Sequence, residues 1–235
     1  MNNAENFLQN KQLAEQSKQQ RLGRLLARPD IWRAANEQQR QRSGIATGSA
    51  TLDALLTGRG WPRGATTELL LDRSGVGELS LLLPALAAAT RQGQMVALVN
   101  PPHIPYAPAL AAAGVQLEKL LILYPRGYKD ELWAIEQTLQ SGCCGALLSW
   151  QGRQAPVDKD LRRLQIAARE GDCVHFQFRP RTCAASPSPA SLRLQLHSDG
   201  EQLGVQLLKQ LGGRSGQRLH LARSADLVRR DQPLH

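Results

Sequence analysis

Short apolar runs alternate with longer amphipathic segments from Thr67 to about residue 180. The apolar runs TELLL, MVALVN, LLILY, GALLSW and VHFQF have the length and composition of buried strands. The segments between them predict helices over residues 78–91, 106–113, 129–140 and 158–170. Strands that are apolar throughout and alternate with helices are typical of parallel sheets covered on both faces. The predicted fold class is therefore α/β.

The end of the chain follows a different pattern. The stretches SLRLQLHS, LGVQLLKQ and GQRLHLA alternate apolar and polar residues, and short turns with Gly, Asp or Ser separate them. This pattern predicts antiparallel strands added at the C-terminal end of a mainly parallel sheet. Together the two patterns predict one core domain over residues 43–221.

Two flanks surround the predicted core. Residues 1–42 are rich in Gln, Arg and Ala, and irregularly spaced leucines give residues 7–42 a thin apolar stripe that breaks at Pro29. We expect an N-terminal helical, basic segment that docks on the core or on a partner, because isolated helices of this kind are marginal. Residues 222–235 are expected to form a basic tail. Because neither an export signal nor a bilayer-length apolar run is evident, we predict a cytoplasmic protein without membrane contact.

The positive charge is concentrated in these flanks. The net charge is +9; residues 1–43 carry eight Lys or Arg against four Asp or Glu, and residues 209–235 carry six against two. About +1 therefore remains for the middle of the chain. A basic chain indicates a nucleic acid or an acidic protein as partner. Solvated tails that only keep the protein soluble are the alternative.

The cysteines indicate no metal chemistry. Cys143, Cys144, Cys173 and Cys183 form no C-x-x-C pair, and no histidines cluster with them in the sequence. We therefore predict no metal site and no redox pair. Reduced cysteines that pack as small apolar residues are expected instead.

A phosphate loop would be expected between the first strand and the first helix of the core, where the sequence reads LLLDRSGVGELSL. In the pattern G-x-x-x-x-G-K-[ST], backbone N–H groups and the lysine bind phosphates, and the hydroxyl binds magnesium. With Gly77 as the second glycine, the first falls on Asp72. The lysine position falls on Glu78 and the hydroxyl position on Leu79. Two carboxylates would repel phosphate oxygens, so we predict a degenerate loop and no nucleotide cofactor.

Part of the loop pattern is nevertheless retained. Ser74, Gly75 and Gly77 can form a tight turn that favours anions at the start of a helix. Ser80, one place beyond the expected hydroxyl position, is the candidate for contact with a metal ion. Residual nucleotide binding at this vestigial loop is therefore an alternative to complete loss.

The neighbouring strand ends lack the other groups of an NTPase. In open parallel sheets, ligands bind beyond the carboxyl ends of the strands. One such end reads NPPHIPYAP, where His103 could act as a base but is more often a structural loop residue in such a setting. Another ends in Ser149-Trp150 and supplies no aspartate for magnesium. Since no other catalytic motif is present in the sequence, we predict that the protein is not an enzyme.

The order of these elements resembles the RecA core, which has the P-loop NTPase fold. The stretch LVNPPHIPYAPALAAAGV occupies the place of the RecA strand and loop that carry the catalytic glutamate, and Pro102 falls on that glutamate. Within the RecA-like group, four stretches resemble the ImuA proteins: LLARPDIWRA, SATLDALLTGRGWPRGATTELLLDRSGVGELSLLLPAL, PPHIPYAPALAAAGV and SPASLRLQL. The likeness reaches from about Leu25 to Leu208. It departs at residues 57–60, which read TGRG where P-G-G-G is more usual.

The resemblance to ImuA implies a non-catalytic accessory factor of translesion DNA synthesis in the SOS response to DNA damage, and thus a role in SOS mutagenesis and DNA repair. The implied partners are an ImuB-type polymerase homologue, an error-prone DNA polymerase and RecA. The chain is also similar to SulA, the SOS division inhibitor that binds FtsZ, and SulA looks like a trimmed version of residues 67–196. The N-terminal segment and the W-P-R-G stretch favour ImuA, and a SulA-like function remains the alternative.

Several residues are candidates for contacts with partners. Trp61, Pro62 and Arg63 form a candidate hot spot, since Trp and Arg dominate interface energetics; a Trp folded over the end of the sheet is the alternative. RecA reads DNA through loops after its fourth and fifth core strands, to which residues 151–157 and 179–189 correspond. We expect a monomer or small oligomer that modifies a RecA filament end. The remaining candidates are Trp32 in the N-terminal segment, Arg223, Arg229 and Arg230 in the tail, and Arg179 and Arg181 for weak DNA contact.

Overall fold

A computed structural model of the protein describes residues 44–222. The predicted N-terminal helical segment, with Trp32, lies outside the described residues. The basic tail, with Arg223, Arg229 and Arg230, also lies outside them. The roles of these two flanks therefore stay predictions.

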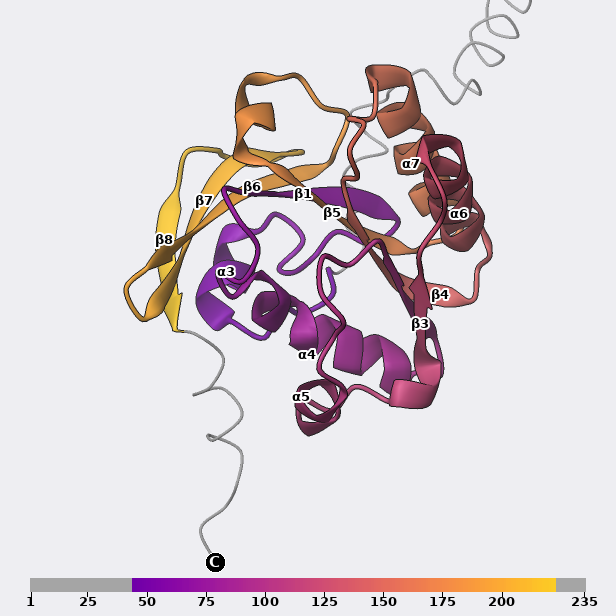
Figure 1. The fold of residues 1–235 in the computed structure, drawn as a ribbon. Helices are drawn as coiled ribbons and strands as arrows, with labels where there is room; N and C mark the ends of the chain where they lie inside the picture. The colour runs from indigo at the N-terminus through magenta and orange to yellow at the C-terminus, as the bar shows by residue number, and fades with distance from the viewer. Residues whose placement is uncertain (1–43, 223–235) are drawn as a thin grey trace, which may run out of the picture. The chain divides into compact units, whose positions relative to one another are not determined.

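The described residues form an eight-stranded sheet with the order β3-β2-β4-β5-β1-β6-β7-β8 (Figure 1). The strands are β1 (Ala65–Leu71), β2 (Met95–Val99), β3 (Leu120–Leu123), β4 (Cys144–Trp150), β5 (Val174–Pro180), β6 (Leu192–Asp199), β7 (Gln202–Gln210) and β8 (Arg218–Ala222). The strands from β3 to β6 in this order are parallel, and the pairs β6–β7 and β7–β8 are antiparallel. The predicted α/β class with antiparallel strands at the C-terminal end is confirmed. The first strand of that end, β6, nevertheless pairs with β1 in the parallel sense.

Helices cover both faces of the sheet (Figure 1). One face carries α3 (Ala50–Leu55), α4 (Glu78–Arg91) and α5 (Ala107–Ala112), and the other carries α6 (Tyr128–Gln140) and α7 (Asp158–Glu170). Two short 3-10 turns, η1 (Leu117–Lys119) and η2 (Arg181–Ala185), complete the described elements. The helices predicted over residues 78–91 and 158–170 agree with α4 and α7 at both ends. In the part of the chain that the structure describes, no helix could span a lipid bilayer.

Each face of the central strands has its own hydrophobic core. Successive residues of a strand point to opposite faces, so Leu148 packs with Leu86 of α4, whereas its neighbour Leu147 packs on the side of α6 and α7. Leu139 of α6 and Leu164 of α7 are buried in this second core. Burial on both faces explains why the parallel strands read as continuous apolar runs in the sequence.

Trp61 lies in the core beneath the sheet end and is not an exposed contact residue. Its side chain is fully buried, and its ring meets that of Phe176 edge to face, with centroids 5.2 Å apart. An antiparallel bridge to Ile45 fixes its backbone. The candidate hot spot is therefore wrong for Trp61, because an aromatic side chain of this size is stabilised by burial under the sheet. Neighbouring Arg63 is partly exposed and forms an ion pair with Asp172 at 3.1 Å.

A buried carboxylate joins the strands on either side of β1. Glu68 of β1 lies between Arg179 of β5 and Arg193 of β6, at distances of 2.8 and 2.7 Å. The hydroxyl of Ser188 donates a third hydrogen bond to Glu68 at 2.6 Å. Arg193 also donates to backbone carbonyl oxygens in the segment that follows β5, including that of Cys183 at 2.8 Å. The network therefore holds this segment against the sheet.

Arg179 is part of this network and does not face a ligand. Its side chain is only 5% exposed, and its Nε atom donates to Oε1 of Gln151 at 3.1 Å. Since Glu68 and Gln151 take up the guanidinium in the interior, the prediction of DNA contact is wrong for Arg179. The second candidate, Arg181, is more than half exposed and pairs with Asp72.

Replacing Glu68 tests how much the fold depends on this network. Glu68→Ala leaves two buried guanidinium groups without their carboxylate, so we expect the free energy of unfolding to fall by about 3–5 kcal/mol. Asp72→Ala breaks an ion pair whose side chains are 54% and 59% exposed, and we expect a change below about 1 kcal/mol. Urea denaturation followed by circular dichroism measures both values. Equal losses in the two variants would contradict a structural role for Glu68.

His175 of β5 forms a second buried polar group. Its Nε2 atom lies 2.8 Å from the hydroxyl of Ser149, and its Nδ1 atom lies 3.1 Å from the hydroxyl of Thr66. The ring is fully buried, and this burial lowers the pKa of His175 to about 3 from its usual 6.5. His175 is therefore neutral in the folded protein near neutral pH.

The depressed pKa of His175 makes stability depend on pH. Between about pH 6.5 and pH 3 the unfolded chain binds a proton at His175 that the folded chain does not bind. The stability contribution is thus present above pH 6.5 and is lost as the pH falls through this window. Urea midpoints measured at pH 7, 5 and 4 should fall more steeply for the wild type than for His175→Gln. Parallel pH profiles would contradict this assignment.

Candidate functional site

The candidate site lies at the carboxyl edge of the parallel strands, where the turn from β1 to α4 corresponds to a phosphate loop. Gly75 and Gly77 have φ angles of 87° and 104°, in the left-handed region that glycine adopts readily. These angles direct backbone N–H groups toward one point at the start of α4. Such a turn is a binding site for an anion.

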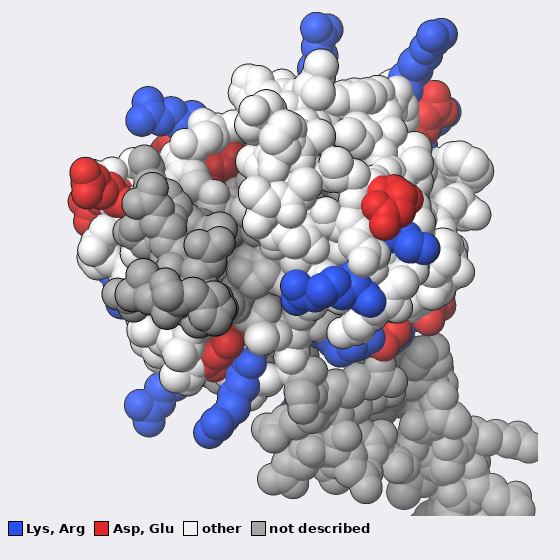
Figure 2. Space-filling model, turned by 90° about the horizontal axis from the view of Figure 1, so that it is seen from below, with Lys and Arg blue, Asp and Glu red and all other residues white. Residues whose placement is uncertain are grey.

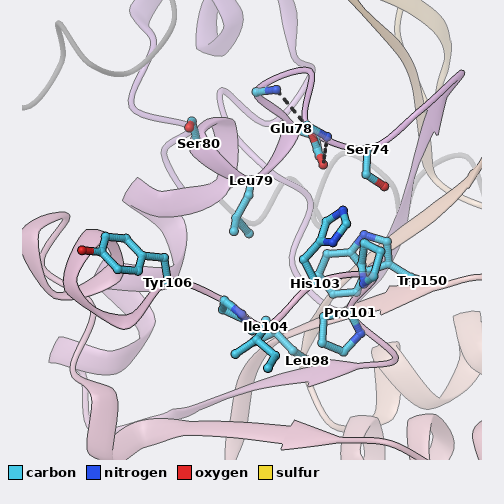
Figure 3. A pocket seen from close by; sticks show the side chains of 14 residues that line it. Ser74, Glu78, Leu79, Ser80, Leu98, Pro101, His103, Ile104, Tyr106 and Trp150 are labelled. Atoms are coloured by element: carbon cyan, nitrogen blue, oxygen red, sulfur yellow. Dashed lines mark hydrogen bonds between the residues drawn. The ribbon is translucent and has the colours of Figure 1, made fainter.

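The anion in this turn is the carboxylate of Glu78 (Figure 3). Its two oxygens accept hydrogen bonds from the N–H of Gly75 at 3.0 and 3.1 Å, and Oε2 accepts one from the N–H of Gly77 at 3.1 Å. The Glu78 residue is 6% exposed, so these bonds are shielded from water. Glu78, which stands at the lysine position of the phosphate-loop pattern, therefore fills the place where a phosphate would bind. Its negative charge also repels a phosphate.

Asp72, the other carboxylate of the degenerate pattern, lies outside the turn. It is 59% exposed and accepts a hydrogen bond from Arg181 at 3.0 Å. The sequence predicted that two carboxylates repel phosphate oxygens at this turn. Glu78 lies where it can do so, whereas Asp72 forms an ion pair at the surface. The role of Arg181 in weak DNA contact stays a prediction.

A cavity of about 340 Å³ opens beside the occupied turn (Figure 3). Ser74, Leu79 and Ser80 line it from the turn and from α4, so these members of the vestigial loop are brought together. The opposite wall comes from the loop after β2 and from the end of β4. The remaining lining residues are Gly75, Gly77, Glu78, Leu98, Pro101, Pro102, His103, Ile104, Pro105, Tyr106 and Trp150.

The loop after β2 presents apolar side chains where an NTPase would place an acid. Pro102 lines the cavity, as do His103 of the same loop and Trp150 at the end of β4 (Figure 3). The amide of Asn100 is directed elsewhere, because its Nδ2 atom donates to Oε2 of Glu131 at 3.0 Å. This strand end therefore supplies no carboxylate to orient a water molecule.

The end of β4 is apolar on the side that faces the cavity. Trp150 stacks on Phe178 with centroids 4.5 Å apart and ring planes 12° apart. Ser149 points to the other face of the sheet, where its hydroxyl contacts His175. No cluster of three or more metal-ligating side chains occurs among the described residues. The arrangement can hold an apolar group. Among the described residues, the lining supplies no Lys or Arg for phosphates, and its one carboxylate, that of Glu78, is already bound by the N–H groups of the turn.

The α/β sheet with a glycine turn between β1 and α4 defines a RecA-like core domain. The RecA N-terminal domain family matches residues 15–148, which is more than half of the chain. The chain therefore belongs to the RecA N-terminal domain family.

Curated relatives agree with this family. Protein RecA of Chlorobaculum parvum is 36% identical over 99 residues, which cover 42% of this chain and 28% of that protein. Protein RecA of Desulforapulum autotrophicum is 31% identical over 131 residues, covering 54% and 34%. Protein RecA of Thermus thermophilus is 31% identical over 118 residues, covering 50% and 34%. The chain thus spans about a third of the length of the RecA proteins it matches.

Removing the carboxylate of Glu78 should free the turn for an external anion. In Glu78→Ala the N–H groups of Gly75 and Gly77 lose their acceptor, so we expect inorganic phosphate to raise the melting temperature of this variant. The wild type should show no comparable shift. Asp72→Ala is the matched control, because it removes a carboxylate that lies outside the turn. Differential scanning fluorimetry at constant ionic strength measures the shifts, and equal shifts in all three proteins would contradict the assignment.

Proposed function

We propose that the protein is a non-catalytic RecA-like accessory factor of SOS-induced translesion DNA synthesis. It acts through contacts with an ImuB-type polymerase homologue, an error-prone DNA polymerase and RecA. The observation that carries the proposal is the Glu78 carboxylate bound to the N–H groups of Gly75 and Gly77. A turn that contains its own anion keeps the shape of a phosphate loop without a nucleotide. The proposed role in translesion DNA synthesis is supported by membership of the RecA N-terminal domain family and by the stretches of sequence that resemble ImuA.

Phosphoryl transfer needs three groups at this place: a cation on the phosphates, a carboxylate for magnesium, and a residue that orients the attacking nucleophile. Glu78 replaces the cation, Trp150 ends the strand that would carry the carboxylate, and Pro102 takes the place of the catalytic glutamate. Among the residues that the structure describes, no Lys or Arg lines the cavity beside the turn. These features support a pseudo-ATPase.

The loop after β2 supports a role in protein contact. Residues 101–115 include no Asp, Glu, Lys or Arg, and Ile104 and Tyr106 are 87% and 72% exposed. Prolines in the loop restrict its backbone, which lowers the entropy lost when a partner binds. Exposed apolar side chains on a preformed loop are typical of protein interfaces. The stretch PPHIPYAP is also among those that resemble ImuA.

The charged side chains on the described surface are distributed as expected for contacts with proteins at separate places. On the face seen in Figure 2, Lys and Arg side chains of the described residues stand apart from one another, with Asp and Glu between them. They do not form a continuous basic stripe on this face, as a protein that tracks a nucleic acid over its whole length would require.

The absence of ATPase function is testable directly. We expect no turnover of ATP and no measurable affinity for Mg·ATP, because the turn is occupied and no Lys or Arg of the described residues lines the cavity. Isothermal titration and a phosphate-release assay on the full chain check both expectations. Saturable binding of Mg·ATP by the wild type would overturn the pseudo-ATPase assignment.

The proposed role is testable in cells. Deletion of the gene should abolish damage-induced mutagenesis, and the wild type and Ser80→Ala should restore it equally, because no metal contact is required of Ser80. Ile104→Asp with Tyr106→Asp should fail to restore mutagenesis and should reduce co-purification of the polymerase partners after DNA damage. Filamentous cells on overproduction, with unchanged mutagenesis on deletion, would instead favour the SulA-like function.

A further inference from the structure

Two buried cysteines lie next to each other at the amino edge of the parallel strands. Cys144 is the first residue of β4, and Cys173 directly precedes β5, the neighbouring strand. Both belong to the core on the side of α6 and α7, where they are 2% and 0% exposed. A hydrogen bond joins their side chains. The fold therefore brings together two thiols that belong to separate segments of the sequence.

An irregularity in β4 directs Cys144 toward Cys173. Against β2, the register of β4 shifts by one residue, so that Gly145 is an extra residue between Cys144 and Ala146. Ala146 packs in the core on the side of α4, and regular alternation along the strand would place Cys144 in the same core. The bulge turns Cys144 to the opposite face of the sheet, where Cys173 lies.

The spacing of the two strands suits a disulfide bond. Ala146 of β4 lies opposite Val174 of β5, and the two cysteines come shortly before these residues. Adjacent strands are about 4.8 Å apart, and a disulfide needs Cα atoms separated by roughly 4.4–6.8 Å. Because the side chains of Cys144 and Cys173 are already in contact, the bond requires rotation of the side chains and no change in strand pairing.

The two thiols differ in reactivity. The hydrogen bond with Cys173 lowers the pKa of the Cys144 thiol by more than burial raises it, and backbone groups of Ala97 and Ala146 lower this pKa further. The same hydrogen bond raises the pKa of Cys173, and burial adds to this effect. Since the thiolate is the nucleophile in thiol oxidation, Cys144 is the residue of the pair that attacks an oxidant.

The pair lies close to the solvent along the chain. Ser141, Gly142 and Cys143, in the turn before β4, are all exposed. The thiol of Cys143 donates a hydrogen bond to Oγ of Ser141 at 3.2 Å. A small uncharged oxidant needs only a local opening of this turn to reach Cys144. A peptide disulfide such as oxidised glutathione would need a much larger opening.

We propose that Cys144 and Cys173 form an oxidation site, at which hydrogen peroxide converts the two thiols into an intramolecular disulfide. The Cys144 thiolate attacks one peroxide oxygen and becomes a sulfenic acid, and the other oxygen leaves as hydroxide and takes up the proton that this thiol released. The Cys173 sulfur then attacks the Cys144 sulfur, and the hydroxyl group leaves as water with the proton of Cys173. Two sulfurs are oxidised, one peroxide is reduced, and two water molecules form.

The disulfide ties the start of β4 to the start of β5, with α7 in the loop that it closes. The site goes beyond the proposed function, because it lies at the opposite edge of the sheet from the phosphate-loop position and uses none of its residues.

The experiment uses the full chain with Cys143→Ser and Cys183→Ser, in which only the buried pair remains. The reduced, folded protein is treated with hydrogen peroxide, unfolded in N-ethylmaleimide and digested with trypsin. Mass spectrometry should find peptides 130–153 and 170–181 joined, with both free thiols lost together. The oxidised protein should melt roughly 4 °C or more above the reduced protein, and dithiothreitol should reverse the shift.

Cys144→Ala in the same background is the matched control and should keep the Cys173 thiol free, without a shift in melting temperature. Circular dichroism before treatment checks that each variant is folded. Three results would overturn the proposal. The first is a pair that stays reduced at peroxide concentrations that oxidise Cys143 of the wild type. The second is oxidation of each thiol by itself, without joined peptides. The third is a disulfide that lowers the melting temperature, since the strands would then have to move to form it.

Discussion

The carboxylate of Glu68 connects the two parts of the sheet. It lies on β1, which has β5 on one side and β6 on the other, and its oxygens bind an arginine from each neighbour. A buried ion is tolerated only when its partners replace the water that it loses. Arg193 extends the network to the carbonyl groups after β5, so the same carboxylate also fixes the segment that covers this end of the sheet. The surface that this segment presents is therefore preformed.

Glu78 applies the same chemistry at the phosphate-loop position. The first N–H groups of a helix have no acceptor within the helix, and in this family a nucleotide phosphate is the expected acceptor. Here a side chain one residue beyond the turn accepts them. Gly75 and Gly77 thus have the left-handed φ angles of a phosphate loop, but their N–H groups bind a side chain of the protein instead of a nucleotide phosphate. A protein can keep a RecA-like core in this way and use the surrounding surface for contacts.

Local periodicity was sufficient to predict the α/β class, but not the parallel pairing of β6 with β1. The α4 and α7 helices could be placed to the residue, because α4 is a long apolar run that follows Gly77 and α7 is an amphipathic segment that ends before Gly171. The sequence also located the phosphate-loop position and its missing lysine. It could not show that Glu78 folds back into the turn, since this depends on the φ angles of the two glycines.

The predictions for Trp61 and Arg179 were wrong because they depend on contacts between residues that lie far apart in the sequence. Trp61 follows a Gly- and Arg-rich stretch that reads as an exposed turn, and only Phe176 of β5 shows that the ring is covered. Arg179 reads as a free cation until Glu68, 111 residues earlier, is placed beside it. Spacing along the chain carries no information on such pairs.

The position of β1 in the sheet has a consequence for how the protein is made. Both neighbours of β1 come late in the chain, because β5 begins at Val174 and β6 at Leu192. A growing polypeptide therefore exposes both edges of an apolar strand until most of its length has left the ribosome. Such edges can pair with other chains. Pairings over this sequence distance also form slowly. Folding of the protein in the cell would thus place a demand on chaperones that hold the nascent strand.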